Sequence, residues 1–138
     1  MEINLENLRL DIVSALYQAD LLKSNDIYIE NEVVNQVFED IINNLDEIDD
    51  IISDTLFNYT IDRLSFIDRA IIRLAVYEMK FTKLAAAIII NEAIELTKTY
   101  SDLDDEKQHK FNNKLLDNLN KAIREWRFCR QKNIPLVN

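Results

Sequence analysis

The stretch that decides the fold runs from Leu64 to Leu119 and contains three phrases: IDRAIIRLAVYEM at 67–79, INEAIELTK at 90–98 and HKFNNKLLD at 109–117. Within each phrase, apolar residues recur at spacings of three and four, which is the spacing along one face of an α-helix. The three phrases therefore predict three helices. None of them contains a recognisable set of catalytic residues.

The rest of the chain shows the same helical periodicity. Many apolar residues of the first half are β-branched, which could suggest strands, but charges at every third or fourth position favour helices. Ser65 and Asp68 have the spacing of a capping box, in which a hydroxyl and an acid three residues later satisfy the first N–H groups of a helix. The predicted helices cover about residues 4–23, 30–44, 48–59, 65–81, 84–100 and 104–132.

These elements predict an all-α protein of six to seven helices. The helices of residues 4–60 would form a first bundle and those of residues 64–132 a second. We expect the two bundles to pack together in one domain that spans residues 1–138. A chain of 138 residues is long enough to bury a core without disulfides or metals.

The composition excludes several classes of protein. The chain has no glycine, so it has no Gly-rich phosphate loop and no dinucleotide-binding fingerprint. Cys129 is the only cysteine, which excludes a disulfide framework and a thiolate metal site. The N-terminus does not resemble a signal peptide, and the longest apolar run, 84–90, is too short to span a bilayer. We therefore expect a cytoplasmic protein that does not enter a membrane.

Two groups of polar residues have spacings that occur in metal or catalytic sites. Glu106 and His109 have the E-x-x-H spacing that di-metal bundles use twice, but His109 is the only histidine. Glu92 and Glu95 have the spacing of paired carboxylates, but no nucleophile or second histidine accompanies them. The sequence therefore predicts no enzyme activity, no metal, no cofactor and no small-molecule substrate.

Charge is unevenly distributed along the chain. Residues 1–60 contain 2 basic and 14 acidic residues, a net charge of −12. Residues 61–138 contain 14 basic and 11 acidic residues, a net charge of +3. The acidic half repels phosphate, so a nucleic acid would bind the second half or the basic surface of a partner.

The last predicted helix concentrates the basic residues. From 107 to 132 the net charge is +6, and five bases recur at spacings of three, four and seven, which places them along one face. Such a row can follow a phosphate backbone, or it can be a solvated face that balances the acidic half; the pattern leaves both open. The five bases are Lys107, Lys110, Lys114, Lys121 and Arg124, and the neighbouring apolar face contains Phe111, Leu115, Leu119, Ala122 and Trp126.

The phrases, taken in order, resemble the NusB family of all-α transcription antitermination factors. IVSALYQADL at 12–21 resembles the A-x-Q-A-L-Y segment of the family's first helix. INEAIELTK resembles INEAIELAK, with Thr97 where the family has alanine, and HKFNNKLLD resembles HKFVNGVLD. The resemblance covers nearly the whole chain and implies a NusB-like helical fold.

The resemblance also implies a function. NusB proteins are not enzymes; they pair with the ribosomal protein NusE, bind the boxA segment of nascent RNA, and join an antitermination complex with RNA polymerase on ribosomal RNA operons. By position, Tyr17, Glu78 and Phe111 resemble residues of the partner surface. The residues expected to contact RNA are Arg9 and the five bases of the last helix.

Two departures from the family pattern bear on RNA binding. The family's first helix is rich in arginine, whereas here only Arg9 remains, which predicts weaker phosphate binding by the first helix. Lys114 stands where the family has a small residue, so we expect looser helix packing there or a lysine that extends outward. The alternative function is a NusB-fold interaction module with little or no RNA binding of its own, such as occurs fused to ribosomal RNA methyltransferases.

Overall fold

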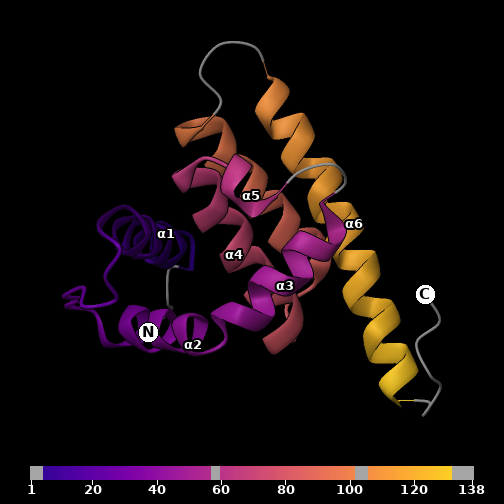
Figure 1. Cartoon of the computed structure of the whole chain (residues 1–138), viewed down its shortest axis with the longest axis horizontal. Coiled ribbons are helices and arrows are strands. Elements are labelled where there is room, and N and C mark those ends of the chain that lie inside the picture. The colour runs from indigo at the N-terminus through magenta and orange to yellow at the C-terminus, as the bar shows by residue number, and fades with distance from the viewer. Residues whose placement is uncertain (1–4, 57–59, 102–105, 132–138) are drawn as a thin grey trace.

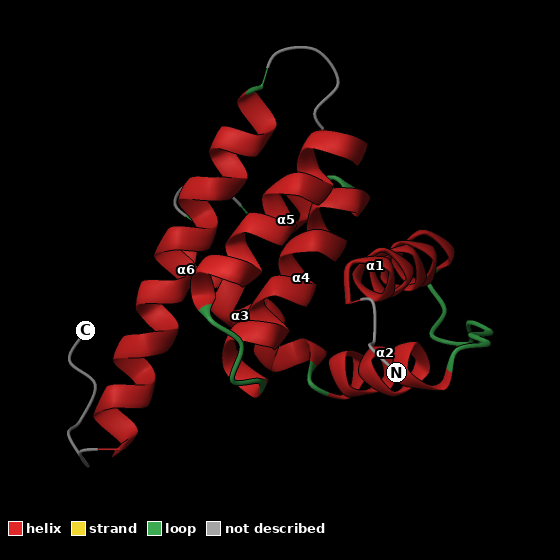
Figure 2. Ribbon diagram, turned by 180° about the vertical axis from the view of Figure 1, so that it is seen from behind, coloured by secondary structure: helices red, strands yellow, loops and turns green. Residues whose placement is uncertain are grey.

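The computed structural model describes residues 5–56, 60–101 and 106–131, with the side chains of 5, 6 and 125–131 left out. Within these ranges all regular secondary structure is helical and there is no strand, which confirms the predicted all-α class (Figures 1 and 2). The elements are α1 (Leu5–Leu22), α2 (Glu32–Asn43), α3 (Leu45–Thr55), the 3-10 turn η1 (Ile61–Arg63), α4 (Phe66–Phe81), α5 (Ala86–Tyr100) and α6 (Lys107–Gln131).

Helix α4 lies at the centre of the molecule. It contacts each of the other five α-helices, and 11 of its 16 residues are buried. Figure 1 shows α5 and α6 beside α4, with α3 across them and α1 and α2 on the other side of α4. A helix covered on nearly all sides must be apolar around most of its circumference, which explains the AIIRLAV sequence at 70–76.

Buried apolar side chains from all six α-helices form one cluster. Full burial of an isoleucine or leucine stabilises the fold by about 1.5–3 kcal/mol relative to exposure. On α6 the buried residues include Leu115 and Leu119, as expected, whereas Ala122 is exposed, and the side chain of Trp126 lies outside the described part. The largest fully buried apolar side chains are Ile41, Ile48, Ile52, Ile71, Ile72, Ile89, Leu116, Leu119, Val13, Val34 and Val76.

The start of α4 has the predicted cap. The Ser65 hydroxyl accepts a hydrogen bond from the backbone N–H of Asp68 at 3.1 Å and donates one to the Asp68 carboxylate at 2.7 Å. In a standard capping box the acid accepts from a backbone N–H instead. Here the acid holds the capping hydroxyl in place, and its second oxygen remains available to other helices.

Two residues adopt backbone angles that usually require glycine. Lys23, directly after α1, has a φ of 53°, and Glu106, directly before α6, has a φ of 60°. A side chain in this left-handed region costs about 1–2 kcal/mol. The absence of glycine from the sequence is therefore accommodated by local strain at two helix ends.

Candidate nucleic-acid interface

The five bases predicted as an RNA-binding row lie on the outer face of α6. Lys107, Lys110, Lys114, Lys121 and Arg124 are all exposed. At about 100° of rotation per residue they occupy an arc of about 100°, and the buried residues of α6 centre on the opposite side of the helix. The row therefore points directly away from the core, where a large polyanion can reach it.

The ion pair that Lys110 makes within this basic row is weak. The Lys110 Nζ lies 3.9 Å from the Glu106 carboxylate, and both side chains are 72% exposed, so the pair contributes little to stability. Lys114 is exposed, as expected for a lysine that extends outward. The exposed Asp117 is an acid on the same side of the helix, between Lys114 and Lys121. The bases can thus turn toward a ligand without breaking the fold.

Arg9 and Glu78, which the sequence assigned to RNA and to the partner, bind each other. The Arg9 Nε lies 3.1 Å from Glu78 Oε1, and Nη2 lies 3.0 Å from Oε2. The side chains are only 8% and 10% exposed. Neither charge is presented to solvent, so contact of either group with RNA or a partner requires this ion pair to open.

Tyr17 and Phe111 remain partly accessible. The Tyr17 ring meets the ring of Phe66 edge-on, with 6.5 Å between centroids, and Phe66 is 39% exposed. Phe111, on α6, is half-buried. Glu78 lies 12 residues beyond Phe66 on α4, or about 18 Å along the helix axis. Glu78 therefore does not contact Tyr17, and it is buried whereas Tyr17 is partly accessible.

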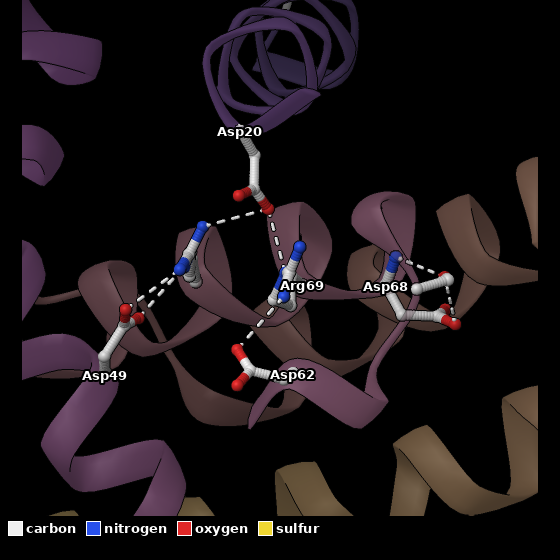
Figure 3. A network of polar contacts seen from close by, with 7 residues as sticks. Asp20, Asp49, Asp62, Asp68 and Arg69 are labelled. Atoms are coloured by element: carbon white, nitrogen blue, oxygen red, sulfur yellow. Dashed lines mark hydrogen bonds and ion pairs between the residues drawn. The ribbon is translucent and has the colours of Figure 1, made fainter. Parts of the chain in front are cut away.

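A network of aspartates and arginines, which the sequence analysis missed, joins α1, α3 and α4 (Figure 3). One oxygen of Asp20 accepts from Arg69 Nε at 2.8 Å and from Arg73 Nη1 at 3.4 Å. Asp49 binds Arg73 through two hydrogen bonds of 2.9 Å. The Asp62 Oδ1 atom lies 3.7 Å from Arg69 Nη1. Part of the acidic charge of the first half is therefore neutralised by arginines of α4.

A second buried network joins α4, α5 and α6. The Asn112 amide is fully buried and donates to Asp68 Oδ1 and to Thr97 Oγ1, both at 3.1 Å. Ser101 donates to the same Asp68 oxygen at 2.7 Å. Thr97 and Asn112 stand where the family phrases have alanine and valine, so two polar departures from the family pattern satisfy each other. The spacing of three from Asn112 to Leu115 was a signal that Asn112 is buried.

Tyr77 links α4 to α2. Its hydroxyl donates a hydrogen bond to Asp40 Oδ2 at 3.1 Å. Burial raises the pKa of the Tyr77 phenol, and the hydrogen bond to Asp40 and the negative charges of Asp40 and Glu78 raise it further. The phenol therefore stays neutral in its structural role.

The described residues offer no metal centre and no membrane span. No group of three or more His, Cys, Asp or Glu side chains within them is arranged to hold a metal ion. No helix in this part of the chain is long and apolar enough to cross a membrane.

These features define an all-helical protein in which Arg9, Arg69 and Arg73 pair with acids of other helices and a row of exposed bases lies on the outward face of α6. The NusB family matches residues 4–121. Transcription antitermination protein NusB of Campylobacter jejuni subsp. doylei is 36% identical over 126 residues, covering 83% of this chain and 93% of that protein. The chain belongs to the NusB family.

Solved structures agree with this assignment. T. maritima NusB superposes with a TM-score of 0.75 at 32% identity, covering 88% of this chain and 93% of that one. A protein chain in the crystal structure of a plectonemic RNA supercoil superposes with a TM-score of 0.73 at 28% identity, covering 85% of this chain and 94% of that one. The NusB-like fold predicted from the sequence is confirmed.

Proposed function

We propose that this chain is a transcription antitermination factor that binds boxA-type RNA together with the ribosomal protein NusE. The pair would join an RNA polymerase antitermination complex on ribosomal RNA operons in the cytoplasm. The chain would act by binding, without enzymatic activity. Family membership supports the antitermination role, because the relatives carry that name.

The outward basic row of α6 is the observation that carries the RNA part of this proposal. Five exposed bases on one face follow a strand of phosphates, and each neutralised phosphate releases counterions and adds salt-dependent affinity. Arg9 does not reinforce the row, because its charge is held by Glu78. We therefore assign phosphate binding chiefly to α6.

The acidic first half supports a role for a basic partner. Residues 1–60 carry a net charge of −12, which repels RNA over distances comparable to the Debye length of about 8 Å at physiological salt. A basic protein bound to this half would remove the repulsion. RNA affinity should therefore be higher for the complex than for the free chain.

The same charge distribution favours the alternative, an interaction module with little RNA binding of its own. The two functions differ in how the complex responds to loss of the basic row. We would measure the affinity of boxA-type RNA for the free chain, for NusE and for the mixture, over a range of salt concentrations. Lys110→Glu/Lys114→Glu would test the row, and Lys23→Glu/Lys98→Glu, which changes the charge equally at other exposed sites, is the matched control.

The antitermination proposal predicts salt-sensitive RNA binding by the mixture that the Lys110/Lys114 variant loses and the control retains. Equal RNA affinity of both variants in complex with NusE would favour the interaction module. Failure of the wild-type chain to bind NusE at any salt concentration would refute the proposed partnership.

A further inference from the structure

Asn112 ties the first turns of α6 to the core. Among residues 107–114, all of which the structure describes, it is the only buried one, with an exposure of 0%. Apolar packing is non-directional, whereas a hydrogen-bonded amide is held in one orientation. The first two turns of α6 therefore have one fully buried anchor, and it is polar. The later turns are held by the buried apolar side chains Leu115, Leu116, Leu119 and Ile123.

Both polar atoms of the Asn112 amide form hydrogen bonds. Nδ2 donates to Asp68 Oδ1 of α4 and to Thr97 Oγ1 of α5, both at 3.1 Å. Oδ1 accepts from Gln108 Nε2, one turn earlier on α6, at 3.0 Å. Asp68 is itself held by Ser101, whose hydroxyl donates to the same carboxylate oxygen at 2.7 Å. Rotation of α6 would break the bonds to α4 and α5, and buried polar groups without partners are unfavourable.

This anchor lies opposite part of the basic row. Lys110 and Lys114 stand two residues before and two residues after Asn112, so each is about 160° around the helix from it. Because Asn112 is directed into the core, both lysines project into solvent, and both are exposed. Rotation of the first turns of α6 by about 100°, which is one residue, would bring one of these lysines toward the neighbouring helices.

We infer that Asn112 is a positioning residue for RNA binding. Its hydrogen bonds to Asp68 and Thr97 fix the rotation of the first turns of α6, and this rotation aims Lys110 and Lys114 at the phosphates. The buried amide does not touch RNA and acts through the two lysines. This inference rests on the proposed function and identifies what orients part of its phosphate-binding row.

The test measures the slope of log K against log salt for boxA-type RNA binding to the complex with NusE. Asn112→Ala removes the amide, and Asn113→Ala makes the same change at the exposed neighbouring residue. We expect Asn112→Ala to reduce the magnitude of the slope by about 1.4, the contribution of two phosphates of a single strand. Asn113→Ala should leave the slope unchanged. A loss of stability alone would not change the slope of a folded variant, because the same phosphates would be contacted.

Combined substitutions separate positioning from simple destabilisation. If Asn112 acts through Lys110 and Lys114, adding Lys110→Gln/Lys114→Gln to Asn112→Ala should change the slope little further. Adding Lys121→Gln/Arg124→Gln instead should still reduce it by about 1.4, because that end of the row has its own buried anchors. A full further reduction by the Lys110/Lys114 substitutions, or an unchanged slope of Asn112→Ala alone, would overturn the inference and leave the proposed function intact.

Thr97 provides a second test, which decides the matter if circular dichroism shows that Asn112→Ala does not fold. Thr97→Val keeps the shape of the side chain but removes the acceptor of one Asn112 hydrogen bond, whereas Thr97→Ser keeps the hydroxyl. Thr97→Val should reduce the magnitude of the slope, and the conservative Thr97→Ser should retain it. Equal slopes of these two variants would overturn the inference. Absence of salt-sensitive RNA binding by the wild-type complex would overturn the proposed function and this inference together.

Discussion

The Arg9 guanidinium and the Glu78 carboxylate bind each other through two nitrogens and two oxygens and join residues 69 positions apart. The pair ties the beginning of α1 to the end of α4 in a buried environment. Sequence resemblance places one of these residues with the RNA contacts and the other with the partner contacts. In the structure the two side chains bind each other.

Breaking this pair should strongly destabilise the protein. Arg9→Met leaves the Glu78 carboxylate buried without its counterion, which should lower the free energy of unfolding by about 3–5 kcal/mol in urea denaturation. The double variant Arg9→Met/Glu78→Leu removes both charges and should recover most of the loss. A single variant as stable as the wild type would show that Glu78 reaches solvent and that the pair is not a structural element.

The Thr97–Asn112 contact should show energetic coupling. Asn112→Val removes the group that donates hydrogen bonds to both Asp68 and Thr97. It should lower the free energy of unfolding by about 1–3 kcal/mol. Thr97→Ala/Asn112→Val restores the two apolar residues of the family phrases. A double-mutant cycle of unfolding free energies should give an interaction energy of about 0.5–3 kcal/mol. Strictly additive effects would contradict the geometry.

Tyr77 should make stability depend on pH at alkaline values. The environment in the folded state raises the pKa of the phenol. The stability that the neutral phenol contributes is therefore complete below its ordinary pKa of 10.0 and is lost as the pH rises through the raised folded pKa. Tyr77→Phe should lower the unfolding free energy by about 0.5–1.5 kcal/mol near pH 8. The difference in unfolding free energy between the wild type and Tyr77→Phe should shrink above pH 10. A constant difference up to about pH 11.5 would argue against a raised pKa of Tyr77.

The C-terminal end of the basic row should be visible in the salt dependence of RNA binding. Lys121→Gln/Arg124→Gln removes two charges that are each expected to contact one phosphate. For single-stranded RNA, the slope of log K against log salt should fall by about 1.4. An unchanged slope in the complex with NusE would place the phosphates elsewhere on the protein.

Lys23 offers a direct test of the strain at the end of α1. Because its φ is 53°, Lys23→Gly should raise the unfolding free energy by about 0.5–1 kcal/mol. Asp26→Gly serves as the control, because Asp26 is exposed, lies in the same loop and does not have a positive φ. This variant should lower the unfolding free energy slightly. The comparison requires only urea denaturation of the two variants.

The sequence predicted α1 and α4 well because their signals are local, whereas α3, predicted at 48–59, is observed at Leu45–Thr55. The spacing of apolar residues placed α1 at about 4–23 and α4 at about 65–81, within one residue of the observed Leu5–Leu22 and Phe66–Phe81. The Ser65 cap was predicted for the same reason, since all of its atoms lie within one helical turn. The family phrases then supplied the arrangement of these helices.

Pairings between distant residues were not predictable in the same way. Arg9 and Glu78 each looked like a surface charge, because nothing in the sequence shows that their helices meet there. The burial of Asn112 was not predicted, because asparagine is mostly exposed in proteins and its partners Asp68 and Thr97 lie on other helices. The basic row was predicted as a face, and its exposure is now established, while its contact with RNA stays a prediction.

The central position of α4 has a consequence for how the molecule opens. An amide proton of α4 can exchange with solvent only after its neighbours separate, and those neighbours are all five other α-helices. Exchange from the middle of α4 should therefore require unfolding of the whole molecule. Binding at the outer face of α6 can alter that surface while this innermost helix remains closed.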